Sequence, residues 1–404
     1  MKSSSTKQKN FAGLGRNVVV LGFVSLFNDI SSEMIYPLLP VFLTISLGAS
    51  AEMLGLIEGI AESTASVLKL FSGWLSDKLK MRKKIVVAGY TISALTRPLM
   101  ALAMSGLQVL FIRFGDRVGK GVRTSPRDAL IADSSAVEVR GKAFGFHRAM
   151  DHIGAIIGPL VAMAVLSLYS GQYRLVFWLA SIPAFLGVLI LVLSVREMPF
   201  TVPPSPAVRP SFRLKGFDRT FRYYLLIIIL FTLGNSSDAF LLLRARALGV
   251  ADAFIPTIWM VLHIVKMISA MPGGMLSDRL GRKKVIVFGW LIYALVYAGF
   301  ATATETWQAW ALFALYGIYF GMTEGVEKAF VADLVEPNLR GTAYGVFHFA
   351  IGIGALPASV IMGILWHRFS PAVAFGFGAM LALVASVLLL GLRITGASAR
   401  STVH

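Results

Sequence analysis

The sequence of 404 residues contains no cysteine and is poor in charge, since only 15% of its residues are Asp, Glu, Lys or Arg. Without cysteine there is no disulfide framework and no thiolate metal site. Soluble globular proteins carry about 25% charged residues, so this chain has too few to cover its surface in water. With 56% hydrophobic residues, the composition predicts an integral membrane protein.

Long apolar runs follow one another along the whole chain. A helix needs about 20 apolar residues to cross a bilayer, so a chain of this length has room for about a dozen. Division at the charged and Gly/Pro-rich connections predicts twelve spans: 17–45, 53–76, 84–104, 107–133, 143–169, 174–195, 221–244, 254–276, 284–303, 307–334, 342–366 and 372–393. We therefore expect an all-α membrane protein.

Acidic residues are scarce, because 21 Asp and Glu oppose 38 Lys and Arg and leave a net charge of +17. In a soluble chain this excess would suggest nucleic acid as a partner. Here the cations gather in alternate connections such as 78–84 and 279–284, whereas 45–52 and 104–108 contain none. The positive-inside rule then predicts that both termini are cytoplasmic. We expect a bacterial inner (plasma) membrane and no nucleic-acid partner.

A single long hydrophilic interval, rich in proline and cations, divides the chain almost in half. Its composition excludes a membrane span. The sequence therefore predicts an N-terminal six-helix bundle over 1–195, a cytoplasmic linker over 196–220 and a C-terminal six-helix bundle over 221–404.

The two predicted bundles repeat one another. Residues 73–77, Gly-Trp-Leu-Ser-Asp, recur as Gly-Met-Leu-Ser-Asp at 274–278, and a second block at 133–145 recurs at 333–345. Two blocks with nearly the same offset indicate an internal duplication. Parallel repeats related by an axis along the membrane normal are typical of one large class of transporters.

The repeated loops resemble the signature motifs of the major facilitator superfamily, and the resemblance covers almost the whole chain. It implies the twelve-helix fold of that family in two pseudo-symmetric bundles. It also implies a gate that stabilises the outward-open state. The gating residues are then Gly73, Asp77, Arg82, Asp133, Arg140, Gly274, Asp278 and Arg282. The first loop departs from the pattern, because Lys80-Met81 replaces the turn glycine that Gly281 supplies in the second.

The predicted span 107–133 carries an unusual row of cations. Arg113, Arg117, Lys120 and Arg127 are spaced by four, three and seven residues, which places them on one helical face. A charge at mid-bilayer costs roughly 2.5–3.5 kcal/mol, so this face must border water inside the protein. We predict that Arg113, Arg117 and Lys120 bind substrate. The resemblance implies that Arg113 is the family's span-4 arginine, which is associated with proton transfer in proton-coupled exporters.

Acidic residues in two spans are candidates for proton coupling. Asp29 and Glu33 lie one helical turn apart, and two carboxylates this close in a low dielectric resist ionising together. One of them can therefore bind and release a proton near neutral pH. Asp116 is the third candidate, and it stands where many members of the family have Gln. The alternative is a permanent ion pair of Asp29 or Glu33 with Arg113 or Arg117.

Other polar residues complete the predicted sites. Asn28, Asn235, Asp238 and Glu324 are further candidates for substrate binding. His147 and Asp151 share a helical face and form a candidate proton relay, since histidine titrates near physiological pH. An ion-pair network is the simpler interpretation of these two residues. We expect no metal site, because too few nitrogen ligands cluster and no thiol is available.

The sequence thus predicts a secondary active transporter that works by alternating access, uses the proton gradient and needs no cofactor. The cations favour a small anionic or amphiphilic organic solute, and we expect export by a monomer in the lipid bilayer. One alternative is a divalent metal cation exporter that uses Asp29, Glu33, His147 and Asp238. Two others are a membrane enzyme with His147 and Asp151 as acid and base, and a receptor that transports nothing. The enzyme lacks a convincing nucleophile or metal.

Overall fold

The computed structural model describes residues 13–39, 42–48, 51–169, 171–198, 216–236, 238–250 and 254–393. Within these ranges the chain is almost entirely helical, with thirteen α-helices. Most of the predicted linker 196–220 lies outside the described residues, so the domain boundaries stay a prediction.

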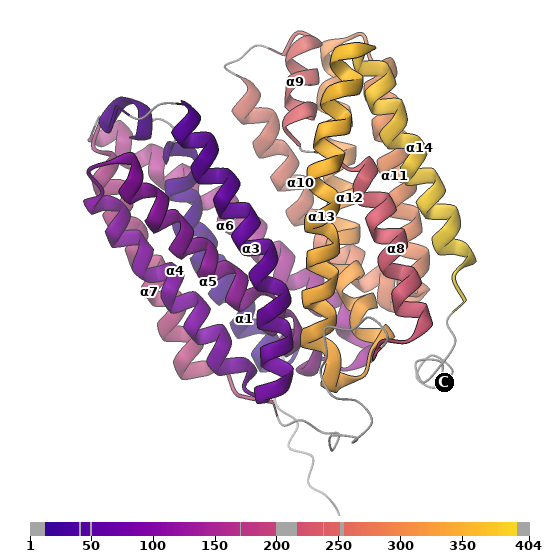
Figure 1. Cartoon of the computed structure of the whole chain (residues 1–404), viewed down its shortest axis with the longest axis horizontal. Helices are drawn as coiled ribbons and strands as arrows, with labels where there is room; N and C mark the ends of the chain where they lie inside the picture. The colour runs from indigo at the N-terminus through magenta and orange to yellow at the C-terminus, as the bar shows by residue number, and fades with distance from the viewer. Residues whose placement is uncertain are drawn as a thin grey trace, which may run out of the picture.

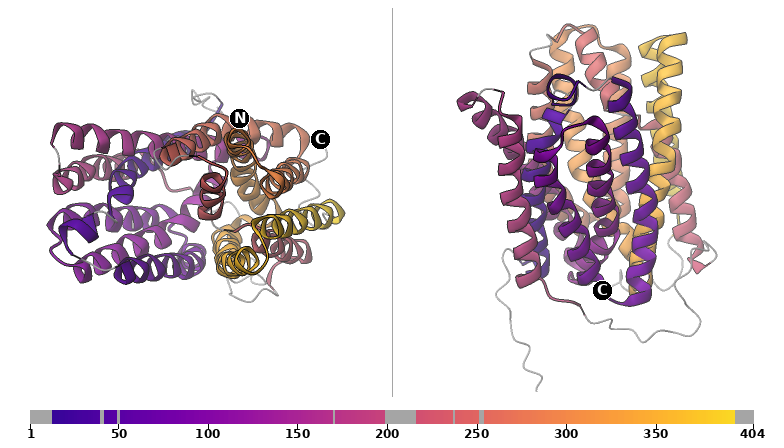
Figure 2. Two further views of the ribbon diagram at one scale, coloured as in Figure 1. Left: turned by 90° about the horizontal axis from the view of Figure 1, so that it is seen from above. Right: turned by 60° about the vertical axis from the view of Figure 1, so that its left-hand side comes forward.

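The helices form two bundles that stand side by side (Figure 1), as the view from above also shows (Figure 2). The first contains α1 (Arg16–Ile35), α3 (Ala51–Leu79), α4 (Arg82–Leu102), α5 (Gly106–Asp133), α6 (Arg140–Leu168) and α7 (Tyr173–Ser194). The second contains α8 (Arg219–Gly234), α9 (Ala239–Ala247), α10 (Ile255–Leu280), α11 (Arg282–Thr302), α12 (Thr306–Leu334), α13 (Arg340–Arg368) and α14 (Pro371–Gly391). The predicted all-α fold with two bundles is confirmed.

The two bundles converge at one end of the molecule and diverge toward the other (Figure 1). We call the convergent end, where α3 and α10 end and α1 and α8 begin, the basic end. Eight segments of the described chain are long and apolar enough to cross a membrane by length and composition alone. The charged helix α5 is not among them, because its interior contains several Arg and Asp residues.

Two of the predicted spans are not single helices. In place of a span over 17–45, α1 stops at Ile35 and a 3-10 turn follows at Tyr36–Leu38. Pro37 cannot donate to the helical ladder, which accounts for the change. In place of a span over 221–244, α8 ends at Gly234 and α9 begins at Ala239. The main chain around Asn235 therefore forms a break inside the second bundle.

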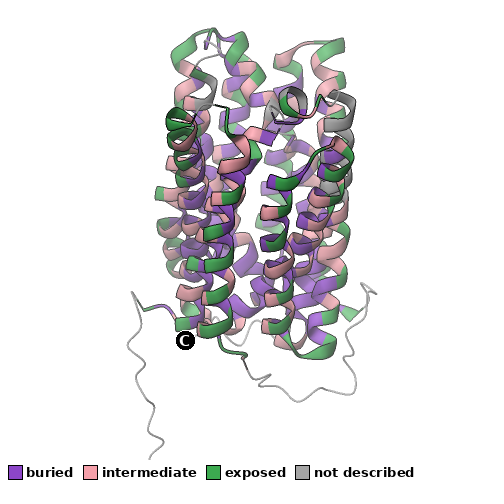
Figure 3. Ribbon diagram, turned by 90° about the vertical axis from the view of Figure 1, so that its left-hand side faces the viewer, coloured by how far each residue is buried: buried purple, intermediate pink, exposed green. Residues whose placement is uncertain are grey.

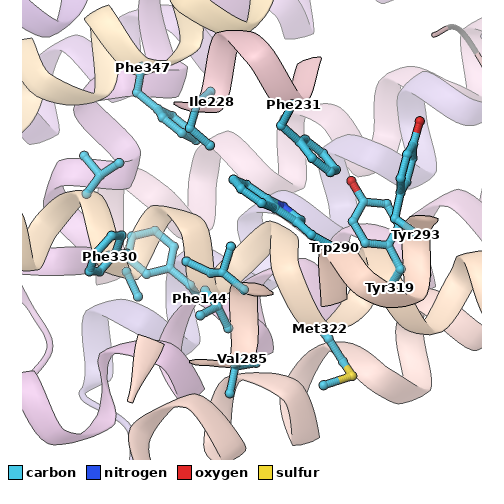
Figure 4. Packing of buried hydrophobic residues seen from close by; sticks show 14 of the residues in the cluster. Phe144, Ile228, Phe231, Val285, Trp290, Tyr293, Tyr319, Met322, Phe330 and Phe347 are labelled. Atoms are coloured by element: carbon cyan, nitrogen blue, oxygen red, sulfur yellow. The ribbon is translucent and has the colours of Figure 1, made fainter. Parts of the chain in front are cut away.

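Buried residues lie mainly inside the bundles and exposed residues mainly on their outer surface (Figure 3). Large apolar side chains occur in both classes. In the second bundle, Phe231 stacks on Trp290 with ring centroids 4.3 Å apart. Tyr293 and Tyr319 pack around Phe231 (Figure 4). Exposed Leu, Val and Phe side chains cover the outside, as expected for a surface that faces lipid.

Close approach of α8 and α14 depends on a pair of glycines. A Cβ atom added at Gly378 would lie 2.7 Å from the carbonyl oxygen of Gly234 and 2.7 Å from the ring of Tyr297. Small residues allow helix backbones to approach each other in membranes, where packing drives association. Gly376 lies two residues away on α14, and a Cβ atom added there would meet nothing within 4 Å.

We therefore predict that Gly378→Ala destabilises the protein and that Gly376→Ala, the matched control, does not. Overpacking of a tight contact costs about 1–3 kcal/mol. The measurement is thermal unfolding of the purified protein in detergent, where only Gly378→Ala is expected to lower the midpoint. Equal midpoints for the two variants would contradict this account of the helix contact.

Candidate functional site: a reciprocal gate and a buried charge network

Asp77, near the end of α3, caps a helix of the other bundle. Its carboxylate accepts hydrogen bonds from the main-chain N–H groups of Gly341 (3.1 Å) and Thr342 (2.6 Å) and from the Thr342 hydroxyl (2.8 Å). These residues open α13, and the N-terminus of a helix carries unsatisfied N–H groups and a partial positive charge. A carboxylate at this position therefore ties the two bundles together.

Asp278 makes the corresponding contact in the opposite direction. It lies near the end of α10 and accepts hydrogen bonds from the main-chain N–H groups of Gly141 (3.0 Å) and Lys142 (2.8 Å), which open α6. Each bundle thus supplies one carboxylate that caps a helix of the other. We call these two contacts the reciprocal caps.

An arginine supports each reciprocal cap. Arg82 binds Asp77 at 3.1 Å, pairs with Asp133 and donates to the carbonyl of Pro337 in the other bundle at 2.9 Å. Its side chain is buried, so these acceptors compensate its charge away from water.

The second arginine follows the same pattern. Arg282 pairs with Asp278, binds Asp333 at 3.2 Å and donates to the carbonyl of Val137 at 2.8 Å. Two further ion pairs cross between the bundles, one between Arg140 and Asp333 and one between Arg340 and Asp133.

The two glycines of the motif are needed for this close contact. A Cβ atom added at Gly73 would collide with the carbonyl oxygen of Gly341, and one at Gly274 would collide with that of Gly141. All eight residues predicted to form the gate therefore meet at the basic end. The departure at Lys80 makes the first loop one residue longer than the second: Lys80 and Met81 join α3 to α4, and Lys80 adopts a positive φ of 54°. Gly281 alone joins α10 to α11, with a φ of 92°.

The cations of α5 surround Asp116. Arg113 binds its carboxylate at 3.2 Å from three residues away on the same helix, and Arg97 from α4 binds it at 3.1 Å. Arg97 was not anticipated from the sequence. Its signal is an isolated cation inside the apolar run that follows Lys84, because such a cation needs a carboxylate from another helix.

The two candidate carboxylates of α1 have different surroundings. Glu33 lies in the field of the same cation group, with Lys120, Arg117 and Arg113 as its strongest charged partners. Asp29 accepts a hydrogen bond from the Asn28 amide at 2.9 Å. Asp29 also faces α6, where its Cβ approaches Gly154. The arrangement therefore places Glu33 among the cations and Asp29 near the carboxylate of Asp151 on α6.

Ion pairs between the bundles continue beyond the basic end. Arg148 of α6 binds Asp151 at 2.8 Å and Glu324 of α12 at 3.0 Å. His147 is buried, its Nδ1 lies 3.5 Å from Asp151, and neither ring nitrogen makes a hydrogen bond within the described part of the chain. Asp151 thus serves chiefly as a partner of Arg148, as the ion-pair interpretation predicts. Glu324 binds across the bundles.

A second contact of this kind centres on Asp128 of α5. It receives Lys328 of α12 at 3.1 Å, His348 of α13 at 3.0 Å and Arg127 from its own helix at 3.0 Å. Asp128 is fully buried. His348 was not anticipated, because no charge pattern in the sequence connects it to a residue 220 positions away. Lys328 and Glu324 therefore each bind a residue of the first bundle.

Lys266 of α10 lies among aromatic rings in the second bundle. Its ammonium is 3.7 Å from the ring centroid of Phe320, 5.8 Å from Trp259 and 6.0 Å from Tyr316. The side chain is buried, and an ammonium over aromatic faces is stabilised electrostatically. The Tyr316 hydroxyl donates to Asp238 at 2.7 Å, next to the break between α8 and α9.

Among the residues that the structure describes, no group of three or more His, Asp or Glu side chains could hold a metal ion. Asp29 and Asp238, two ligands of the alternative metal exporter, lie on opposite bundles and make the separate contacts described above.

The sequence of this chain matches one known family of proteins. The family model described as Major Facilitator Superfamily matches residues 21–262 and 224–402. The chain belongs to the major facilitator superfamily. It is a membrane transporter of that family, and its family and structural neighbours are transporters, not enzymes.

The relatives span nearly the full chain. The MFS-type transporter MJ1317 of Methanocaldococcus jannaschii is 36% identical and covers 95% of this chain and 96% of its own length. The multidrug resistance protein MdtH of Salmonella arizonae is 23% identical, with coverages of 86% and 83%.

Solved structures share the fold at low identity. The human organic anion transporter MFSD10 superposes with a TM-score of 0.78 at 16% identity, covering 93% of this chain and 99% of its own. The fucose:proton symporter FucP of E. coli gives a TM-score of 0.74 at 16% identity, with coverages of 94% and 98%.

We predict that Asp77→Asn loosens the basic end. The amide keeps an acceptor oxygen but loses the charge, and charge-assisted hydrogen bonds contribute about 1.5–3 kcal/mol. Because the chain lacks cysteine, Leu339→Cys, a buried position before α13, gives a single reporter thiol. Maleimide should label this thiol roughly tenfold faster when Asp77→Asn is also present. The control is the exposed Glu138→Gln. Unchanged labelling with Asp77→Asn would contradict the capping role.

Proposed function

We propose that this transporter works by alternating access and that the structure corresponds to its outward-open state. The basic end would then be the cytoplasmic side, closed by the reciprocal caps and the ion pairs around them. The supporting observation is that the gate contacts lie at the same end as the clustered cations, which the positive-inside rule assigns to the cytoplasm. We expect a monomer in a bacterial inner membrane.

The solute we propose is a small organic anion or an amphiphile with an acidic group. The observation that carries this proposal is the excess of buried cations on α4 and α5. Arg97, Arg113 and Arg117 are buried and share the carboxylates of Asp116 and Glu33. Charges inside a membrane protein are costly unless a partner compensates them. An anionic solute supplies such a partner when the cavity between the bundles is open.

Lys266 supports the amphiphilic part of the proposal. It adds a buried cation from the second bundle, and the rings of Trp259, Tyr316 and Phe320 surround it. Ligand sites combine a largely apolar and aromatic lining with a few polar groups that fix orientation. A solute with one acidic group and an apolar body matches this lining.

Transport is proposed to be driven by protons and directed outward. Protonation of Glu33 would change the field at Arg117, and departure of Arg97 and Arg113 from Asp116 would allow that carboxylate to bind a proton. Either event alters charge pairing in one conformation more than in the other, which shifts the balance between the two states.

We predict that at least one of Asp29→Asn, Glu33→Gln and Asp116→Asn uncouples transport from the pH gradient. The test uses proteoliposomes with an imposed gradient, with counterflow at equal pH measured in parallel to show that the carrier still exchanges solute. The exposed Glu336→Gln is the matched control and should retain full coupling. Normal coupling in all three variants would refute the proposal for these residues.

For the substrate, we predict that Arg113→Gln and Lys266→Gln each weaken the handling of an anion. Carboxyfluorescein serves as the anionic probe and ethidium as the cationic one, both measured by counterflow in proteoliposomes. Loss of one charge-assisted contact of about 1.5–3 kcal/mol raises the half-saturation concentration of the anion roughly tenfold or more. Exchange of ethidium alone by the native protein would overturn the anionic assignment.

A further inference from the structure

A groove runs along the outer surface of the second bundle between α8 and α14, at the right of Figure 1. It encloses about 770 Å³ and lies next to the basic end, where α8 begins and α14 ends. It faces away from the first bundle, so it lies outside the gate and the charge network described above. In a membrane protein, this surface faces lipid.

The two ends of the groove differ in chemistry. Arg219 and Arg393 line it at the basic end, while Leu226, Val387 and Leu388 line the rest. Arg219 donates to the Tyr223 hydroxyl at 2.9 Å, which holds its guanidinium against the wall of the groove. A cationic rim above an apolar channel is complementary to an anionic head group joined to an acyl chain.

A third cation lies close to the end of α14. The Lys283 ammonium donates to the main-chain carbonyls of Leu390 (2.9 Å) and Leu392 (3.2 Å). The rim is thus positive at the level where the helices leave the membrane. Clustered Lys and Arg between or beside membrane helices attract anionic lipid head groups.

The equivalent seam of the first bundle, between α1 and α7, is bridged by hydrogen bonds within the protein. Asn17, the second residue of α1, donates to the carbonyl of Arg196 at 2.9 Å and accepts from its N–H at 2.9 Å. Arg196 follows the end of α7 by two residues, as Arg393 follows the end of α14. In the second bundle, Thr220 stands at the position of Asn17 and lines the groove. The two halves of the repeat therefore differ in the residues at this seam.

We propose that this groove is a binding site for one anionic phospholipid. Arg219 and Arg393 hold the phosphate of the head group, and an acyl chain lies along Leu226 and Leu388. The site depends on the membrane location of the chain and not on the solute that it carries. Failure of the lipid site would therefore leave the proposed transport function untouched.

The test measures lipid selectivity of the purified full-length protein. Delipidated protein in a mild detergent is titrated with phosphatidylglycerol or phosphatidylcholine of identical acyl chains, and bound lipid is counted by native mass spectrometry. The native protein is expected to prefer phosphatidylglycerol. The double variant Arg219→Gln, Arg393→Gln should lower that preference roughly tenfold or more, since each cation near the surface contributes to anionic lipid attraction.

A matched double variant distinguishes lipid binding in the groove from a general effect of positive charge on lipid affinity. Arg222→Gln with Arg279→Gln removes two exposed cations near the basic end that do not line the groove. This control should keep the native preference. An equal loss of the preference for phosphatidylglycerol in both double variants would overturn the proposal. Equal binding of the two lipids by the native protein would also overturn it.

A third variant tests the apolar part without any change of charge. Leu388→Trp fills the channel from an exposed position, so it is compatible with folding. It should lower the number of tightly bound phosphatidylglycerol molecules by one while the thermal midpoint in detergent stays near that of the native protein. Unchanged lipid binding by Leu388→Trp would overturn the assignment of the acyl chain to this groove, even if the arginine variant did not fold.

Discussion

The arrangement of the whole molecule depends on one interaction, a carboxylate on the N-terminus of a helix that belongs to the other bundle. Asp77 caps α13 and Asp278 caps α6, each through two main-chain N–H groups. Such a contact needs no partner side chain on the other bundle, because the N-terminus of a helix always presents main-chain N–H groups as donors. The duplicated motif therefore creates two equivalent caps at once, and the bundles are held at two points instead of one.

Further charge contacts lie behind the caps, and the proposed alternating access requires all of them to change when the basic end opens. Arg148 binds Glu324 and Lys328 binds Asp128 across the bundles. Breaking a buried ion pair by removing one partner costs about 3–5 kcal/mol, so such pairs separate only where water or a new partner replaces the old one. Opening to the basic side therefore requires concerted hydration of the network, which favours two discrete states over a continuum of partly open ones.

Apolar run length was sufficient to predict the fold class, and the recurring motifs were sufficient to predict the repeat. The role of the eight residues that meet at the basic end was implied by the resemblance to the family, and their role as a gate stays a prediction. The pairing of Asp116 with Arg113 is local, because the two residues lie three positions apart on one helix. The partners Arg97 and His348 were not anticipated, since they reach Asp116 and Asp128 from other helices and no local periodicity encodes such a distance. The break after Gly234 was also missed, because apolar runs lie on both sides of the short polar interval 235–238.

The two halves differ where a perfect repeat would fail. Residues 200 positions apart are equivalent in α5 and α12. One such pair is in direct contact where the bundles meet: the Lys328 ammonium lies 3.1 Å from the Asp128 carboxylate. An exact duplicate would place two like charges there in a buried setting, which is strongly unfavourable. Divergence to opposite signs converts that repulsion into an attraction between the halves. The same divergence leaves Asp116 facing the arginines of the first bundle while its equivalent, Tyr316, lies near Lys266 in the second. Departures from the repeat thus give the interiors of the two bundles different polar groups, although the bundles share one fold.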